Sequence, residues 1–121
     1  MKYPKEKVKD ILFKLNFELP KDYLNYIISN DGVVENHLNY IDLWPLDKLF
    51  QYNDECESFI YLPSYLIIGT NGGGTALAIK INTGEIFATE MIGMDENDVI
   101  KVANNFTEYL QYFKTKNLDY I

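Results

Sequence analysis

Two mainly apolar stretches joined by a short polar turn constrain the fold of this chain most. Residues 75–81 and 85–91 flank Asn82-Thr83-Gly84, and this arrangement is typical of a β-hairpin. The segment Gly69-Thr70-Asn71-Gly72-Gly73-Gly74 precedes the hairpin. Glycine disfavours an extended strand and tolerates left-handed backbone, so a turn is expected there. The centre of the chain is therefore predicted to form a mainly antiparallel sheet, with a mixed sheet as the alternative.

Helical spacing of apolar residues marks both ends of the chain. The pattern predicts a helix over about 4–15, a second beginning near Pro20 and ending before Gly32, and a last one over about 98–116. The apolar positions that carry the pattern are Val8, Ile11, Leu12, Leu15, Tyr23, Leu24, Ile27, Ile28, Val99, Val102, Ala103, Phe106, Leu110 and Phe113. Helices on either side of a strand-rich centre indicate the α+β class.

The middle of the chain is less regular. Residues 33–43 are expected to be irregular and then a strand, which Pro45 interrupts. A short helix or turn is expected over 46–50, and a polar, exposed loop over 51–58. Residues 59–68 are apolar and β-prone, although Pro63 divides them.

The size of the chain predicts one domain over residues 1–121. A length of 121 residues, with 47% apolar and 24% charged residues, suits a single core. The single cysteine excludes an internal disulfide. No apolar run approaches the length of a membrane span, and the N-terminus resembles no signal peptide, so we expect a cytoplasmic protein without a membrane partner.

The charge of the chain bears on its partners. It has 11 lysines, no arginine and 18 acidic residues, for a net charge of −7. Residues 31–57 hold seven acids against Lys48 alone. Such a surface repels phosphate backbones, which argues against nucleic acid as a partner. It attracts a basic protein instead, although many acidic domains use their charge only to stay in solution.

Motifs for catalysis, cofactors and metals are incomplete. The glycine segment at 69–74 lacks the lysine of a phosphate-binding loop, and a strand follows it where a dinucleotide loop needs a helix. His37 and Cys56 are the only residues of their types, so neither a zinc site nor another metal site is expected. Cys56 lies between two glutamates, which disfavours a nucleophilic pair with His37. We expect no catalytic residue and no cofactor.

Aromatic residues offer a different kind of site. The chain has ten tyrosines, seven phenylalanines and one tryptophan, and most of them fall on the predicted apolar faces. Trp44, Tyr52, Tyr61 and Tyr65 either belong to the core or line a recognition surface, because tyrosine and tryptophan are favoured anchors at protein interfaces.

Taken in order, several segments resemble the SUKH superfamily, which includes the yeast cell-wall assembly regulators. The segments are 19–24 followed by 30–32, then 43–49, 66–79, 82–87 and 102–110, within a span of about 18–113. They are similar to the family's opening helix, its strand leading to a short helix, its glycine turn and hairpin, and its closing helix. The resemblance implies an α+β fold without a catalytic constellation.

The resemblance also implies a function in binding, since many small bacterial members are similar to immunity proteins of polymorphic toxin systems. The first hypothesis is a cytoplasmic immunity protein, a monomer or weak dimer, that neutralises a toxin domain, with a basic nuclease as one candidate. The alternatives are a scaffold or regulator of cell-wall or stress signalling, and a small-molecule-binding domain. The residues expected to contact the toxin are Trp44, Asp47, Tyr52, Asp54, Glu55, Glu57, Asn71, Gly72 and Gly73.

Overall fold

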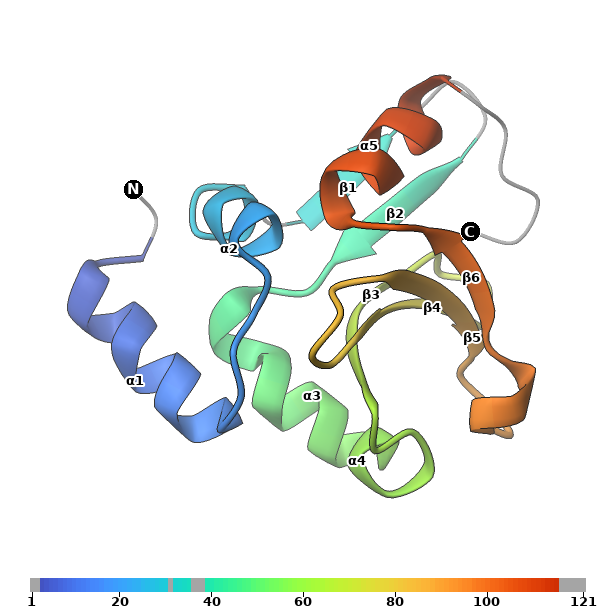
Figure 1. Ribbon diagram of the computed structural model, residues 1–121, viewed down its shortest axis with the longest axis horizontal. Helices are drawn as coiled ribbons and strands as arrows, with labels where there is room; N and C mark the ends of the chain where they lie inside the picture. The colour runs from blue at the N-terminus through green and yellow to red at the C-terminus, as the bar shows by residue number, and fades with distance from the viewer. Residues whose placement is uncertain (1–2, 31, 36–38, 116–121) are drawn as a thin grey trace.

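An antiparallel sheet forms the centre of the computed structural model, which describes residues 3–30, 32–35 and 39–115 (Figure 1). Its six strands follow one another in chain order, each antiparallel to the next. They are β1 (Gly32–Glu35), β2 (Tyr40–Leu43), β3 (Tyr65–Thr70), β4 (Thr75–Lys80), β5 (Ile86–Glu90) and β6 (Ile100–Ala103). The predicted α+β class and the antiparallel sheet are confirmed.

Helices precede, interrupt and follow the sheet (Figure 1). They are α1 (Lys5–Leu15), α2 (Lys21–Ile27), the 3-10 helix η1 (Leu46–Lys48), α3 (Leu49–Glu55), α4 (Ser58–Tyr61), the 3-10 helix η2 (Glu96–Asp98) and α5 (Phe106–Thr115). The helix α2 packs beside α5, where the rings of Tyr23 and Phe106 meet edge to face with centroids 5.2 Å apart. The second helix and the last helix of the described chain thereby pack against each other.

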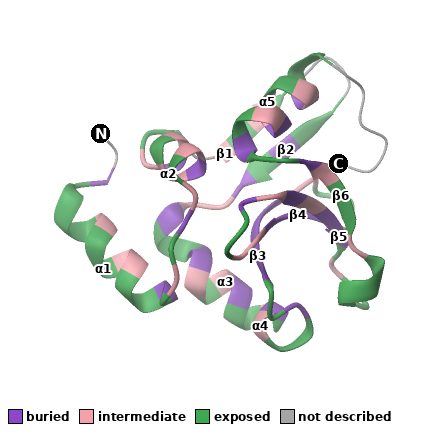
Figure 2. Ribbon diagram, viewed as in Figure 1, coloured by how far each residue is buried: buried purple, intermediate pink, exposed green. Residues whose placement is uncertain are grey.

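The sheet buries a different set of side chains on each face, because side chains alternate along a strand. On one face Leu66, Ile68 and Leu77 join the main core beneath the helices. On the other face Ile67 and Ala78 form a smaller core. In Figure 2 the central strands are mostly buried, while the outer sides of α1 and α4 are exposed.

Gly69 lets β2 and β3 approach closely. A Cβ atom at this position would lie 2.6 Å from the backbone oxygen of Asp42, closer than a carbon and an oxygen can approach. The pairing of β3 with β4 shifts register between Ile67 and Gly69, which indicates a β-bulge at the same place. The glycine is therefore required by the neighbouring strand.

Polar side chains fix the beginning of α5. Asn105 Oδ1 accepts a hydrogen bond from the Glu108 backbone N–H at 2.7 Å, and Glu108 Oε1 accepts one from the Asn104 N–H at 3.2 Å. This is close to a capping box. The Asp22 carboxylate of α2 accepts hydrogen bonds from both the backbone N–H and the hydroxyl of Thr107. These contacts place the start of the helix at Phe106.

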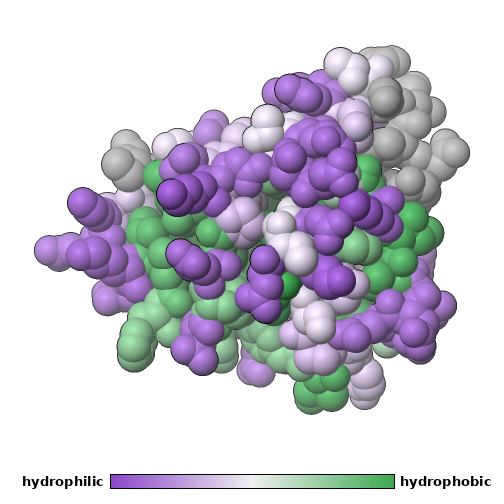
Figure 3. Space-filling view, in the orientation of Figure 1, coloured by the Kyte–Doolittle hydropathy of each residue, from purple (hydrophilic) through white to green (hydrophobic). Residues whose placement is uncertain are grey.

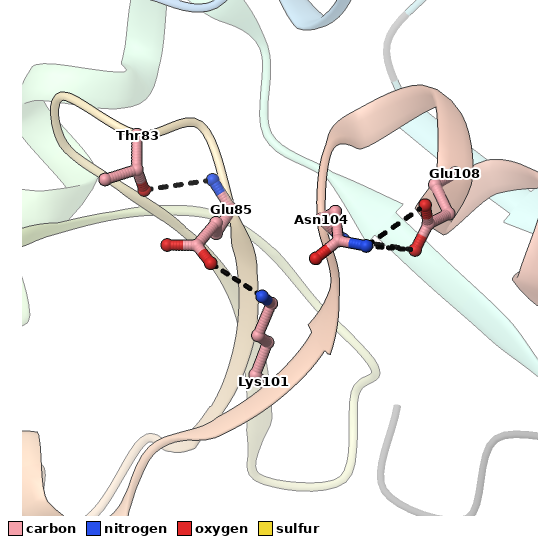
Figure 4. Close-up of polar contacts among 5 residues, drawn as sticks. All are labelled: Thr83, Glu85, Lys101, Asn104 and Glu108. Atoms are coloured by element: carbon pink, nitrogen blue, oxygen red, sulfur yellow. Dashed lines mark hydrogen bonds and ion pairs between the residues drawn. The ribbon is translucent and has the colours of Figure 1, made fainter.

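The sequence-based prediction of the last helix was wrong in its first part. Residues 100–103 form β6, which pairs with β5. Lys101 Nζ lies 2.6 Å from Glu85 Oε2 across this pairing (Figure 4). Apolar residues at 99, 102, 103 and 106 fit a helix when read alone. The edge of the hairpin offers backbone hydrogen bonds that only a strand can use.

Three other predictions were also wrong. The expected loop over 51–58 is helical as far as Glu55, and α4 replaces the first part of the expected strand over 59–68. The strand β1 precedes β2 where irregular chain was expected. The hairpin of β4 and β5, with its turn at 82–84, lies where the sequence predicted it, and so do the helices α1 and α2. His37 lies outside the described residues.

Candidate functional site

Three acidic side chains are exposed where α3 turns into α4. Asp54 and Glu55 are the last residues of α3, and Glu57 occupies the turn before α4. Glu57 adopts left-handed backbone, with φ of 63°, at the turn between the two helices. We call these three residues the acidic corner. The structure thus brings together three of the acids expected to contact a toxin.

A buried amide directly beside the acidic corner holds it in place. Asn53 is fully buried, and its Nδ2 donates to the backbone oxygens of Leu49 at 2.8 Å and Ile67 at 2.9 Å. Its Oδ1 accepts hydrogen bonds from the Ile67 N–H at 2.9 Å and the Ser58 hydroxyl at 2.6 Å. One side chain therefore ties α3, α4 and β3 together, and all its hydrogen-bonding capacity is used.

Sequence reasoning missed Asn53 because it lies in a stretch of polar residues. The spacing of Asn53 in the sequence indicates that it is buried. It follows Leu49 by four residues on a helix and therefore shares the buried face. An asparagine on an apolar face needs hydrogen-bond partners, because burying an unpaired amide is costly. This requirement predicts the network once 49–55 is recognised as a helix.

Trp44 and Tyr52 lie against each other, as a joint recognition surface would require. Their ring centroids are 5.2 Å apart and nearly perpendicular, at 85°. Trp44 is held by its backbone N–H, which donates to the Ile68 oxygen at 2.8 Å. Both side chains are half-buried, so each has a packed side and an accessible side. Tyr65, in contrast, is buried against Phe87 in the smaller core.

Asp47 has its own partners outside the acidic corner. Its carboxylate lies 3.6 Å from Lys7 Nζ of α1 and accepts a hydrogen bond from the Tyr3 hydroxyl at 3.4 Å. Lys7 also lies over the Tyr3 ring, 5.6 Å from its centroid. Asp47 therefore links η1 to the beginning of the described chain.

The glycine turn between β3 and β4 is organised by Asn71. Its Oδ1 accepts hydrogen bonds from the N–H groups of Gly73 at 2.8 Å and Thr75 at 3.2 Å. Gly72 has φ of +77°, and a Cβ there would overlap the hydroxyl of Tyr40. A Cβ at Gly73 would make only ordinary van der Waals contacts. Asn71 and Gly72 thus shape the turn, whereas Gly73 has room for a methyl group.

The lysine–carboxylate pairs in the described part of the chain lie elsewhere, at Lys7–Asp47 and Lys101–Glu85. The hydrogen bond from Lys101 lowers the pKa of the Glu85 carboxyl (Figure 4). At the acidic corner, Glu55 instead accepts a hydrogen bond from neutral Gln51 at 3.4 Å. The negative charge of this corner is therefore not neutralised within the described residues.

The described residues have neither a metal-binding cluster nor a membrane-spanning helix. They contain no group of three histidine, cysteine, aspartate or glutamate side chains placed to hold a metal ion. Across the same residues, no helix has both the length and the apolar character needed to cross a bilayer.

A groove of about 340 Å³ lies between the 17–21 segment and the turn of the β4–β5 hairpin.

The antiparallel sheet and the helices around it form a small α+β domain, and the acidic corner lies on its surface. The family model of the SMI1 / KNR4 family (SUKH-1) matches residues 4–112, which is most of the chain. The chain belongs to this family, as the resemblance in its sequence suggested.

One curated protein is also similar over a short stretch. It is the chloroplastic phosphoribosylformylglycinamidine cyclo-ligase of Arabidopsis thaliana, 36% identical over 58 residues. The alignment covers 46% of this chain but only 15% of the ligase, so most of that protein has no counterpart here.

Proposed function

We propose that this protein is a non-catalytic immunity protein that binds a basic toxin domain and neutralises it by occupying its surface. The observation that carries the proposal is the acidic corner of a SUKH-1 family member: Asp54, Glu55 and Glu57 are exposed together. Carboxylates of this kind speed the association of a positively charged partner.

The surroundings of the acidic corner support a binding role. The Asn53 network fixes the backbone from which the three carboxylates project. A fixed backbone limits the entropy that is lost when a partner binds. The neighbouring Trp44–Tyr52 pair supplies aromatic surface of the kind that anchors protein interfaces.

The proposal is tested by charge reversal with a matched control. The test variant carries Asp54→Lys, Glu55→Lys and Glu57→Lys. The control carries Glu6→Lys, Asp10→Lys and Glu18→Lys, which are exposed acids at α1 and beyond it. Both variants change the net charge equally. Binding to a basic toxin domain, chosen from the genes next to this one, is followed by stopped flow.

We expect the test variant to associate about tenfold more slowly than the control, because local charge steers the encounter. Equal rates for the two variants would remove the acidic corner from the proposal. If the wild-type protein does not bind the toxin domain, and native pull-down recovers several moderate partners, the scaffold or regulator hypothesis replaces it.

A further inference from the structure

A pocket opens between the end of α3, α4 and the segment that follows β5. Its volume is about 340 Å³, and its lining residues are Cys56, Tyr61, Met91, Gly93 and Met94. Figure 1 shows α4 and the segment after β5 near each other in the lower part of the molecule. Thioether side chains adapt to the shape of an inserted group, so two methionines suit a pocket for an apolar side chain.

Apolar side chains are exposed beside this pocket. Tyr61, which lines it, is 55% exposed, and Ile60 before it is 68% exposed. Ile92 lies between two lining residues and is 92% exposed. Figure 3 shows that hydrophilic side chains cover much of the face seen there, with hydrophobic ones in smaller areas. Exposed apolar side chains next to a pocket are a feature of an interaction site.

Acidic residues are frequent in both segments that line the pocket. Residues 54–61 and 90–98 contain no lysine. Their acids are all exposed and are Asp54, Glu55, Glu57, Glu90, Asp95, Glu96 and Asp98. Glu96 Oε1 accepts a hydrogen bond from the Ser64 N–H at 3.2 Å, which brings the second segment against the residues after α4.

The negative charge around the pocket determines which kind of molecule can bind there. An acidic rim repels a second copy of the same surface, nucleic acid and anionic lipid. It attracts lysine and arginine side chains, while the pocket itself excludes water from an apolar group. The matching ligand is therefore a protein segment in which an apolar side chain is flanked by basic residues.

We propose that the pocket between Cys56, Tyr61, Met91 and Met94 binds one apolar side chain from a lysine- or arginine-rich segment of a partner protein. The inference rests on the proposed function, since it places the toxin's anchor beside the acidic corner. Tyr52 continues the surface, because it lies one helical turn before Cys56. The site is thus an apolar centre within an acidic rim.

The test uses the methyl signals of methionine in NMR. The chain has three methionines, Met1, Met91 and Met94, so two of the three signals report on the pocket. The probe is a short peptide with one tryptophan between runs of lysine, and its control has alanine in place of tryptophan. We expect saturable shifts of Met91 and Met94, with affinity about tenfold weaker for the alanine peptide.

Equal affinity for the two peptides, or no saturable shift, would overturn the pocket proposal. Methyl shifts that depend on protein concentration without peptide would identify a second copy as the occupant and would also overturn it. Ile92→Ala removes an exposed side chain between the lining residues Met91 and Gly93 and should weaken tryptophan-peptide binding. Phe13→Ala removes a side chain that is 86% exposed on α1 and should leave it unchanged.

Calorimetry with the toxin domain separates this inference from the proposed function. Weaker toxin binding by Ile92→Ala, but not by Phe13→Ala, would support both proposals. Toxin binding that is equal for wild type and Ile92→Ala would overturn the pocket and keep the immunity function. If the peptide shifts the methionine signals and the toxin does not bind, the pocket stands and the immunity proposal fails.

Discussion

Asn53 Oδ1 accepts a hydrogen bond from Ser58 Oγ at 2.6 Å, and this contact closes the turn between α3 and α4. Asp54, Glu55 and Glu57 all lie within that turn or next to it. The same amide also pairs with both backbone groups of Ile67 in the sheet. The position of the acidic corner is therefore set by a buried residue.

Asn53→Ala should lower the free energy of unfolding by about 3 kcal/mol, because it leaves several buried polar groups without partners. Gln51→Ala, on the exposed side of the same helix, should change it by less than about 0.5 kcal/mol. Urea unfolding of both variants measures the difference. Similar stabilities for the two would show that the network contributes little.

Two glycines should respond differently to substitution by alanine. Gly69→Ala should destabilise the fold by about 2 kcal/mol, because its Cβ would meet the Asp42 backbone oxygen. Gly73→Ala should leave stability nearly unchanged, since its surroundings have room for a methyl group. Thermal unfolding checks both. Gly73→Ala then also tests toxin contact at the glycine turn without disturbing the fold, and unchanged affinity would exclude that contact.

Buried tyrosines predict a loss of stability at high pH. Burial raises the pKa of Tyr23 and Tyr109 above the ordinary value of 10.0. The unfolded chain therefore deprotonates first, and stability that is present in full below about pH 10 decreases as the pH rises further. Neither hydroxyl has a hydrogen-bond partner within the described residues.

Tyr23→Phe should therefore stabilise the protein by about 1 kcal/mol at neutral pH, because it removes a buried, unpaired hydroxyl. It should also make the decline above pH 10 less steep. Unfolding curves from pH 7 to alkaline conditions measure both effects. A variant less stable than wild type at pH 7, with the same alkaline slope, would contradict this account.

Asp47 and Asp54 should contribute differently to toxin binding. Both side chains are exposed, but Asp47 contacts Lys7 and Tyr3, whereas Asp54 lies at the acidic corner. Asp54→Asn should slow association about twofold to threefold, and Asp47→Asn should leave the rate nearly unchanged. Stopped-flow kinetics at low salt measure both rates. A larger effect at Asp47 would move the interface toward α1.

The parts of the fold that the sequence predicted are those where one local pattern decides. The hairpin around Asn82-Thr83-Gly84 and the helix over 5–15 have a turn or a periodicity that fits one structure only. Residues 99–103 fit both helix and strand, and pairing with β5 decides between them. Such pairing joins distant parts of the chain, so local spacing does not reveal it.

The sequence predicts which charged residues the candidate site contains, but not which of them lie together in space. The polar residues around positions 54, 55 and 57 predict that these acids are exposed. The helix that presents them depends on the hydrogen bond between Asn53 and Ile67 of β3. The second acidic segment, at 90–98, joins the site because the chain after β5 returns toward α4. This return is a tertiary contact, which the residues of either segment alone do not indicate.

The most direct measurement is calorimetry of the purified protein with a basic toxin domain chosen from the genes next to its own, at low and at high salt. The account predicts tight binding at a ratio of one to one, weakened by salt because charge pairs at the acidic corner are screened. Absence of binding at either salt concentration would contradict the immunity function. Tight binding that salt does not change would contradict the role of the acidic corner.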